Sequence, residues 1–200
     1  MSQLLESIRI ENRQLQHIEL HNQRFNHARA MLFGAVDYIR LEKVIQIPFG
    51  INNERYKCRV ISKGNEISFE IAPYRQRPVE KLKIVSMKQI SYTYKTVERS
   101  QLDWAFAARE TADDVIIIKN GVVTDSFAAN LLFFDGKKWY TPDTPLLKGT
   151  QREFLLSEGF IEEQKIELSE LIRFKSVKLI NAMIDFERAP EIMIPDGILF

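Results

Sequence analysis

Residues 121–134, with the sequence GVVTDSFAANLLFF, place one acid among small and polar residues. Asp125 follows a predicted tight turn at Asn120 and precedes Ala128 and Asn130. A carboxylate with small neighbours can stand close to a ligand and hold a charge or a proton there. Taken alone, Asp125 has the features of a turn or cap aspartate, which is the more common use of that residue. The segment is a candidate site that needs support from elsewhere in the chain.

The segment LLKGTQRE, at residues 146–153, has the composition of a helix start. Backbone N–H groups at a helix N-terminus bind phosphate well, and Gly149, Thr150 and Gln151 would supply such groups. A guanidinium that forks onto two oxygens would complete a phosphate site, and Arg24 on a predicted helix is the candidate. Taken separately, the first feature predicts only a helix cap, and Arg24 is typical of a solvated helix.

Standard metal and hydrolase signatures are absent from the sequence. It contains no H-E-x-x-H, no paired C-x-x-C, no G-x-S-x-G and no G-x-x-x-x-G-K-[ST] segment. The histidines do not form a recognised metal-ligand set, and we interpret His21 and His27 as solvated helix positions. Cys58 is the single cysteine, so we expect a reduced thiol without a role. No metal site is expected.

The composition is that of a globular protein without a strong charge excess. Lys and Arg number 28 against 27 Asp and Glu, so neither nucleic acid nor an anionic membrane is an expected partner. The first residues carry no signal-peptide pattern, and no stretch approaches the ~20 apolar residues that a membrane span needs. We therefore expect a cytoplasmic protein.

The first part of the chain predicts a small α+β domain. Its expected elements are a hairpin over residues 6–20, a helix over 21–33, a second helix over 38–45 and a hairpin over 56–73. The longer helix is predicted from an apolar face that Gly34 ends. The second hairpin is predicted from alternation on both sides of a turn at Lys63, Gly64 and Asn65.

The later part of the chain predicts a larger α/β domain. Asn120-Gly121 and Asp135-Gly136 each join two apolar segments, which is the pattern of tight hairpins. Two such hairpins in a row predict an antiparallel sheet. The other expected elements are helices over residues 98–109, 150–158 and 169–174, and strands near residue 82, over 162–168 and over 176–183.

Several segments together resemble one known family. Residues 121–133, GVVTDSFAANLLF, are similar to its motif G-x-[VI]-[TS]-E-x-x-x-x-N-[IL]-F, and TP and LLKGTQR are similar to its T-P and L-x-G-I-T-R. ESIRI and HNQRF resemble its E-T-I-R strand and H-x-x-R helix. The chain is thus identified as a member of the class IV aminotransferase family, the pyridoxal-phosphate enzymes of fold type IV. Residues 38–92 are similar in layout only.

This resemblance implies an α+β fold of type IV with two domains. A small N-terminal domain is expected over residues 1–85, and a larger C-terminal cofactor-binding domain with an antiparallel sheet and hairpins over 86–200. Family members are usually homodimers that act on small amino compounds, and we expect both properties here.

The resemblance also implies a cofactor, pyridoxal 5′-phosphate, and the residues that bind it. Lys95 occupies the position of the catalytic lysine, whose amine binds the cofactor aldehyde and moves protons at the substrate carbon. Asp125 would face the pyridine nitrogen and keep it protonated, and Ala128 would let the backbone approach the ring. The residues expected at the phosphate are Arg24, Thr150 and Gln151.

The chain departs from the family pattern in three places. The family has glutamate at Asp125 and threonine at Gln151, and its D-R-x-x-x-x-G-D-G segment before E-T-I-R has no counterpart. KTVERSQLDWAF and DSFAANLLFF resemble the aminodeoxychorismate lyase branch, which makes 4-aminobenzoate and pyruvate for folate synthesis. Two alternatives stay open: an aminotransferase for branched-chain or D-amino acids, and a degenerate relative without catalytic activity.

Overall fold

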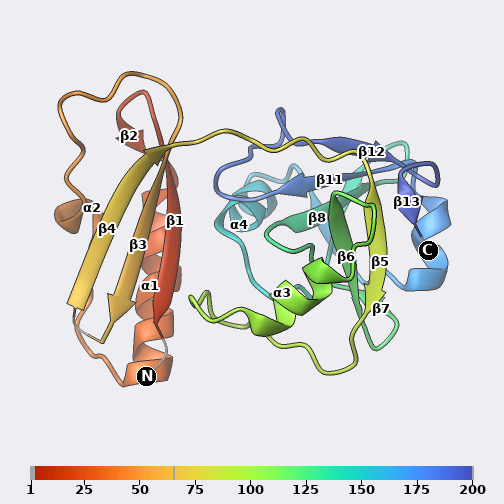
Figure 1. The fold of residues 1–200 in the computed structure, drawn as a ribbon, viewed down its shortest axis with the longest axis horizontal. Coiled ribbons are helices and arrows are strands. Elements are labelled where there is room, and N and C mark those ends of the chain that lie inside the picture. The colour runs from red at the N-terminus through yellow and green to blue at the C-terminus, as the bar shows by residue number, and fades with distance from the viewer. Residues whose placement is uncertain (1–2, 65, 200) are drawn as a thin grey trace. The chain divides into compact units, whose positions relative to one another are not determined.

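The computed structural model describes residues 3–64 and 66–199, and it divides the chain into two compact units (Figure 1). The first unit comprises Met1–Gln76 and Tyr94–Glu98, and the second comprises Arg77–Thr93 and Arg99–Phe200. The chain therefore enters the second unit, returns to the first for one short segment and then enters the second again.

The first unit is an antiparallel sheet with the order β2-β1-β3-β4, against which α1 packs (Figure 1). Its elements are β1 (Leu4–Glu11), β2 (Gln14–Leu15), α1 (Ile18–Phe33), α2 (Leu41–Val44), β3 (Tyr56–Lys63) and β4 (Glu66–Pro73). The core lies between the sheet and the helix, where Ile8 and Val60 pack with Phe25. Alternation of apolar residues in β1 and β3 supplies this buried face.

The predicted hairpin over 56–73 is confirmed, although Asn65 lies outside the described residues; of the hairpin predicted over 6–20 the turn forms, but its second strand is only Gln14–Leu15 and residues 18–20 belong to α1. The predicted helix over 21–33 is also confirmed; α1 starts earlier, at Ile18, and ends where Gly34 adopts a left-handed conformation. The second helix is one turn, Leu41–Val44, and not the predicted 38–45. The reason is Asn26, whose side chain donates to Ile39 O at 2.7 Å and accepts from Ile39 N at 2.8 Å. This pairing gives the backbone a partner outside a helix.

The second unit contains two mixed sheets, with orders β13-β5-β6-β7 and β10-β9-β8-β11-β12. The first sheet consists of β5 (Leu82–Ser86), β6 (Asp114–Lys119), β7 (Val122–Val123) and β13 (Ile198–Leu199). The second consists of β8 (Asn130–Phe134), β9 (Trp139–Pro142), β10 (Glu162–Gln164), β11 (Ser176–Ile180) and β12 (Glu191–Met193). Apolar side chains from both sheets, among them Ile116 and Phe133, share one core.

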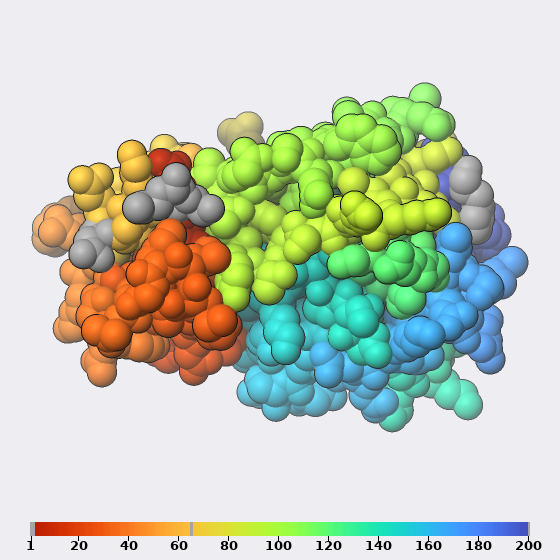
Figure 2. Space-filling view, turned by 90° about the horizontal axis from the view of Figure 1, so that it is seen from below, coloured from red at the N-terminus to blue at the C-terminus, as the bar shows by residue number. Residues whose placement is uncertain are grey.

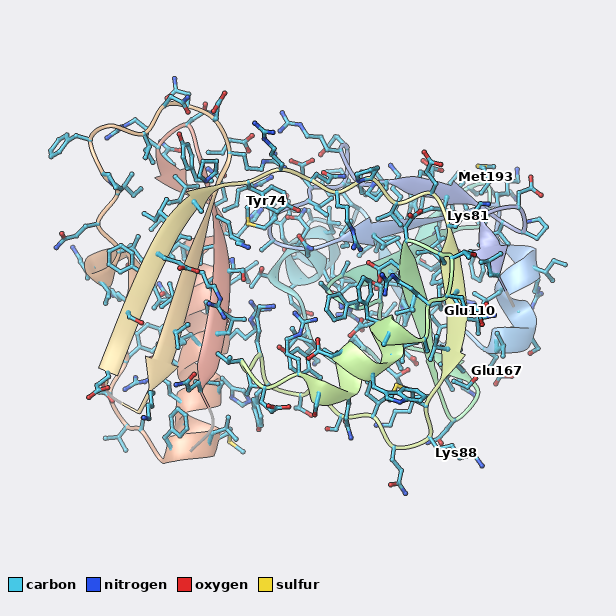
Figure 3. The ribbon with its side chains drawn as sticks, in the orientation of Figure 1. Tyr74, Lys81, Lys88, Glu110, Glu167 and Met193 are labelled. Atoms are coloured by element: carbon cyan, nitrogen blue, oxygen red, sulfur yellow. The ribbon has the colours of Figure 1, made fainter. Side chains whose placement is uncertain are left out.

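The helices of the second unit are α3 (Ser100–Ala107), α4 (Thr150–Ser157) and a 3-10 helix (Leu168–Arg173). Figure 2 shows the yellow-green side chains of the α3 region as a continuous band on the surface seen from below. After α3 the chain turns back to the sheet, where Glu110 lies 3.2 Å from Lys83 Nζ of β5; Glu110 is labelled in Figure 3. The 3-10 helix begins after Glu167, whose side chain forms a capping box with Glu170, and not at Ser169 as predicted.

The predicted antiparallel pairing of the strands and the predicted boundary between the domains both differ from the structure. The two tight hairpins form, but they lie in separate sheets, and both sheets contain parallel pairs, such as β5 with β6 and β9 with β10. The division at Gln76 also falls before the predicted boundary between residues 85 and 86, because β5 pairs with β6 of the second unit.

Over the described residues no helix is long and apolar enough to cross a membrane.

Candidate active site

Asp125 is buried in the loop that connects β7 to β8, with 5% of its surface exposed. Its Oδ1 accepts a hydrogen bond from Asn130 Nδ2 at 2.8 Å, and its Oδ2 accepts one from Leu147 N at 3.0 Å. Burial raises the pKa of Asp125 to about 6, although these donors favour the ionised form. The side chain is therefore a carboxylate at neutral pH that can readily take up a proton.

Asn130 connects the Asp125 loop to the start of α4. Besides Asp125, its Nδ2 donates to Leu147 O at 2.9 Å. A Cβ atom on Gly149 would lie 2.0 Å from Asn130 Oδ1, so this position has room only for glycine. The spacing of acid, asparagine and glycine in the sequence thus corresponds to one packed arrangement in the second unit.

The rest of the loop is fixed by hydrogen bonds on both sides. Ser126 N donates to Ala129 O at 2.9 Å, and Asn181 Nδ2 donates to Ala128 O at 3.0 Å. Asn181 follows β11, in which Ile180 is paired with Asn130 of β8. Sequence reasoning missed Asn181, because only the pairing of β11 with β8 places it beside the loop.

Gln151 Oε1 and Ser126 Oγ are among the buried polar atoms that have no hydrogen-bond partner among the residues that the structure describes. Both side chains are 2% exposed. Gln151 lies in the first turn of α4, after Gly149 and the buried Thr150. Because an unpaired buried polar atom costs free energy, such atoms are expected where a ligand supplies the missing partner.

Arg24 lies in the first unit, where it pairs with Glu6 of β1. Arg24 Nε donates to Glu6 Oε1 at 2.9 Å and Nη2 donates to Oε2 at 2.5 Å, while His21 Nδ1 lies 2.7 Å from Oε2. Burial alone would raise the pKa of Glu6, but Arg24 and His21 overcome it and hold the pKa at about 2. His21 is fully buried, so its interpretation as a solvated helix position is wrong. The sequence signal was present in the i, i+3 spacing of His21 and Arg24, which places both on one helix face.

Lys95 lies in the short segment of the chain that belongs to the first unit, alongside β1. Its carbonyl accepts a hydrogen bond from Leu5 N at 2.8 Å, and Thr96 forms an isolated antiparallel bridge with Leu4. Burial lowers the pKa of His21; the hydrogen bond to Glu6 and its charge oppose this effect, and the charges of Arg24 and Lys95 add to it. The first unit thus brings Arg24 and Lys95 together around His21 and Glu6. The second brings together Asp125, Ala128, Thr150 and Gln151.

The order of these residues along the chain and the two-unit fold correspond to a known family. Residues 3–192 match amino-transferase class IV. The chain belongs to this family. Among the described residues, no group of three or more His, Cys, Asp or Glu side chains could hold a metal ion.

Relatives of this class IV aminotransferase family member match it over most of their length. An uncharacterized protein of Haemophilus influenzae is 40% identical over 185 residues, which cover 92% of this chain and 98% of that protein. The crystal structure of a protein from Haemophilus somnus, provisionally named a 4-amino-4-deoxychorismate lyase, is 31% identical, with a TM-score of 0.86 over 92% of this chain and 97% of that one.

The fold is fold type IV of the pyridoxal-phosphate enzymes. A hypothetical aminotransferase from Mycobacterium tuberculosis, in its form with bound pyridoxal phosphate, has a TM-score of 0.78 at 18% identity. That match covers 98% of this chain and 81% of the other, and at this identity it shows the shared fold.

The class IV aminotransferase family typically binds pyridoxal 5′-phosphate, and the residues of this chain fit that group. Asp125 is a buried acceptor suited to a protonated pyridine nitrogen, and Gln151 at the start of α4 has a buried atom that lacks a partner. Arg24, in the first unit, donates from Nε and Nη2 to the two carboxylate oxygens of Glu6. Because this chain has Gln151 where the family has threonine, the hydroxyl group of this segment is that of Thr150, one position earlier.

Proposed function

We propose that the protein is a pyridoxal-phosphate-dependent lyase that converts 4-amino-4-deoxychorismate to 4-aminobenzoate and pyruvate. The observation that carries the proposal is the buried Asp125, held on both carboxylate oxygens within a loop that is itself fixed by Asn130 and Asn181. The 31% identical protein of Haemophilus somnus, which this chain covers almost entirely, supports the choice of substrate.

Each candidate residue has a distinct role in this proposal. Bound at the site, the cofactor ring would accept electrons released when a bond at the substrate's amino-bearing carbon breaks. Asp125 would accept a hydrogen bond from the ring nitrogen and stabilise its protonated form. Lys95 would hold the cofactor through its amine and then remove the proton from the amino-bearing carbon. The anion would be bound by Arg24, Thr150 and Gln151.

The reaction needs no other reactant. The ring of the substrate loses the proton at the amino-bearing carbon, and the bond between the ring and the enolpyruvyl oxygen breaks. The electron pair leaves with that oxygen, which is released as pyruvate after protonation, and the ring becomes aromatic. Because the atoms of 4-aminobenzoate and pyruvate together equal those of the substrate, neither an oxidant nor water is consumed.

The test is product formation by purified protein incubated with pyridoxal 5′-phosphate and 4-amino-4-deoxychorismate. Equal amounts of 4-aminobenzoate and pyruvate are expected from the wild type and none from Lys95→Ala. Asp125→Ala should still bind the cofactor and lose turnover by about a hundredfold or more, the scale of a lost preorganised charge. Full turnover by Lys95→Ala would overturn the assignment of that lysine.

The same preparation separates the alternatives. An aminotransferase would release a keto acid from a branched-chain or D-amino acid and produce no 4-aminobenzoate. A degenerate relative would gain no visible absorption after incubation with pyridoxal 5′-phosphate and would release neither product. Either result would overturn the proposed lyase.

A further inference from the structure

The side chain of Arg99 joins two parts of the second unit that are distant in sequence. Arg99 precedes α3, and its Nη2 donates to Phe127 O at 2.6 Å. Its guanidinium carbon lies 4.3 Å from the centre of the Phe127 ring and 5.9 Å from that of Tyr92. A flat guanidinium can stack on a ring and donate in its own plane at the same time, which a lysine ammonium cannot do.

One of the two parts is the base of the segment that carries Lys95. The chain leaves the second unit after Thr93 and returns to it at Arg99. Gln101 joins the two ends, because its side chain accepts from Ser91 N at 2.9 Å and donates to Gln89 O at 3.1 Å. Residues 94–98 are therefore a loop of chain whose ends are held together within the second unit.

The short length of this loop limits where Lys95 can lie. Lys95 is four positions before Arg99 (99 − 95 = 4), and four residues of fully extended chain span at most about 14 Å. Whatever holds Arg99 therefore limits the reach of the Lys95 backbone. This limit follows from covalent geometry alone.

The other part is the Asp125 loop, and it offers a firm attachment. Phe127 is two positions after Asp125 (127 − 125 = 2), and its N–H donates to the buried Asp114 Oδ1 at 3.2 Å. The Phe127 ring also stacks on Phe106 of α3, with 4.2 Å between ring centres. The carbonyl that accepts from Arg99 thus belongs to a residue fixed by its amide and by its ring.

We propose that Arg99 is a positioning residue that anchors the base of the Lys95 segment on Phe127 and so limits where the Lys95 amine can lie when the cofactor is bound. The inference rests on the proposed function, because Lys95 and Asp125 need a fixed separation only if they act on one cofactor. Arg99 itself touches neither the cofactor nor the substrate in this proposal.

The test compares two ligands of nearly the same shape. Pyridoxal 5′-phosphate has an aldehyde that reacts with a lysine, whereas pyridoxine 5′-phosphate has an alcohol in its place and binds without reacting. The ratio of their dissociation constants measures what Lys95 adds to binding. In Arg99→Met the ratio of the two dissociation constants should fall about tenfold, which is the size of the interaction energy between coupled neighbouring residues. The affinity for pyridoxine 5′-phosphate should change little. In a Lys95→Ala background the Arg99 substitution should have no such effect.

Arg109 provides a matched control. Its Nη1 donates to Phe106 O at 2.9 Å and its guanidinium carbon lies 4.1 Å from the Phe106 ring centre, so it makes the same two kinds of contact with Phe106, the ring on which Phe127 stacks, instead of with Phe127 itself. Arg109→Met should leave the ratio of the two dissociation constants unchanged. Thermal unfolding of the cofactor-free proteins shows whether each variant is folded, and Arg99→Lys replaces Arg99→Met if the latter unfolds.

The outcomes separate the two proposals. An equal loss of affinity for both ligands in the Arg99 variant, or a ratio equal to that of Arg109→Met, would show a purely structural role and overturn the inference. A wild-type protein that prefers neither ligand and gains no visible absorption with pyridoxal 5′-phosphate would overturn the proposed function, and the inference with it.

Discussion

Asn130 and Asp125 form a side-chain pair in which the amide of Asn130 donates to a buried carboxylate at 2.8 Å. The same amide also holds Leu147 O, and its oxygen fills the space where a side chain at Gly149 would begin. One residue therefore orients the acid and fixes the approach to α4. Loss of the Asn130 side chain should therefore affect both the orientation of Asp125 and the segment that leads into α4.

Replacement of Asn130 by alanine should raise the pKa of Asp125 above its value of about 6, because a donor to the ionised form is lost. The affinity for pyridoxal 5′-phosphate should then fall at neutral pH, and its dependence on Asp125 ionisation should move to higher pH. Absorbance titrations with the cofactor across a pH series measure this shift. Asn181→Ala is the control, since it removes a donor to Ala128 O and none to Asp125. An unchanged pH profile in Asn130→Ala would contradict the expectation.

The raised pKa of Asp125 should make the cofactor-free protein less stable as the pH rises from 3.8 to about 6. In this window the folded state binds more protons than the unfolded state, so the free energy of unfolding falls with increasing pH. Asp125→Asn should remove this dependence on pH, at the cost of one of the two hydrogen bonds at this position, because an amide accepts through one oxygen only. Urea unfolding on both sides of the window measures the effect.

Asp135 is the matched control for that substitution. Hydrogen bonds from the backbone of Lys138 and Lys137 lower the pKa of this exposed carboxylate, so its contribution has the opposite sign. Asp135→Asn should lose a little stability above the ordinary pKa of aspartate. The same response from both variants would show that burial of Asp125 is not the cause.

Glu6→Gln should destabilise the first unit, because Arg24 and His21 lose a buried anionic partner. The pKa of Glu6 is held at about 2 against an ordinary value of 4.5, so its contribution is present above pH 4.5 and is lost as the pH falls from 4.5 to 2. We expect a loss of about 3 kcal/mol at neutral pH, the scale of a broken buried ion pair. Chemical unfolding measures it. Glu19→Gln, in the exposed first turn of α1, should change stability little, and an equal loss there would contradict the assignment.

Gly149→Ala should force Asn130 to move, because the new Cβ would lie 2.0 Å from Asn130 Oδ1. We expect a loss of about 2 kcal/mol in the free energy of unfolding, typical of overpacking, together with weaker cofactor binding. Gly50→Ala is the control, since no atom lies within 4 Å of a Cβ at that position. In an Asn130→Ala background the Gly149 substitution should cost much less, and equal costs in both backgrounds would show that this contact is not the cause.

The local elements of the fold could be predicted from the sequence because neighbouring residues decide them. Gly34 ends α1 in a left-handed conformation, and Asn120 with Gly121 makes the turn between β6 and β7. The pairing of strands could not be predicted in the same way. Which sheet accepts β8 depends on β11, more than forty residues later, and the single turn of α2 depends on the contact of Asn26 with Ile39.

The sequence by itself determined the residue types of the candidate site and their order, from Arg24 and Lys95 to Asp125 and Gln151. It also contains Gly149, but only the tertiary structure shows why glycine is required there: the side chain of Asn130 occupies the space of a Cβ atom at position 149. Tertiary structure decided which polar groups are buried together: Glu6 with His21, Asn181 with Ala128, and Arg99 with Phe127. The physical reason is that a polar group removed from water is stabilised by a hydrogen-bond partner, and packing between distant segments decides which partner each of these groups has.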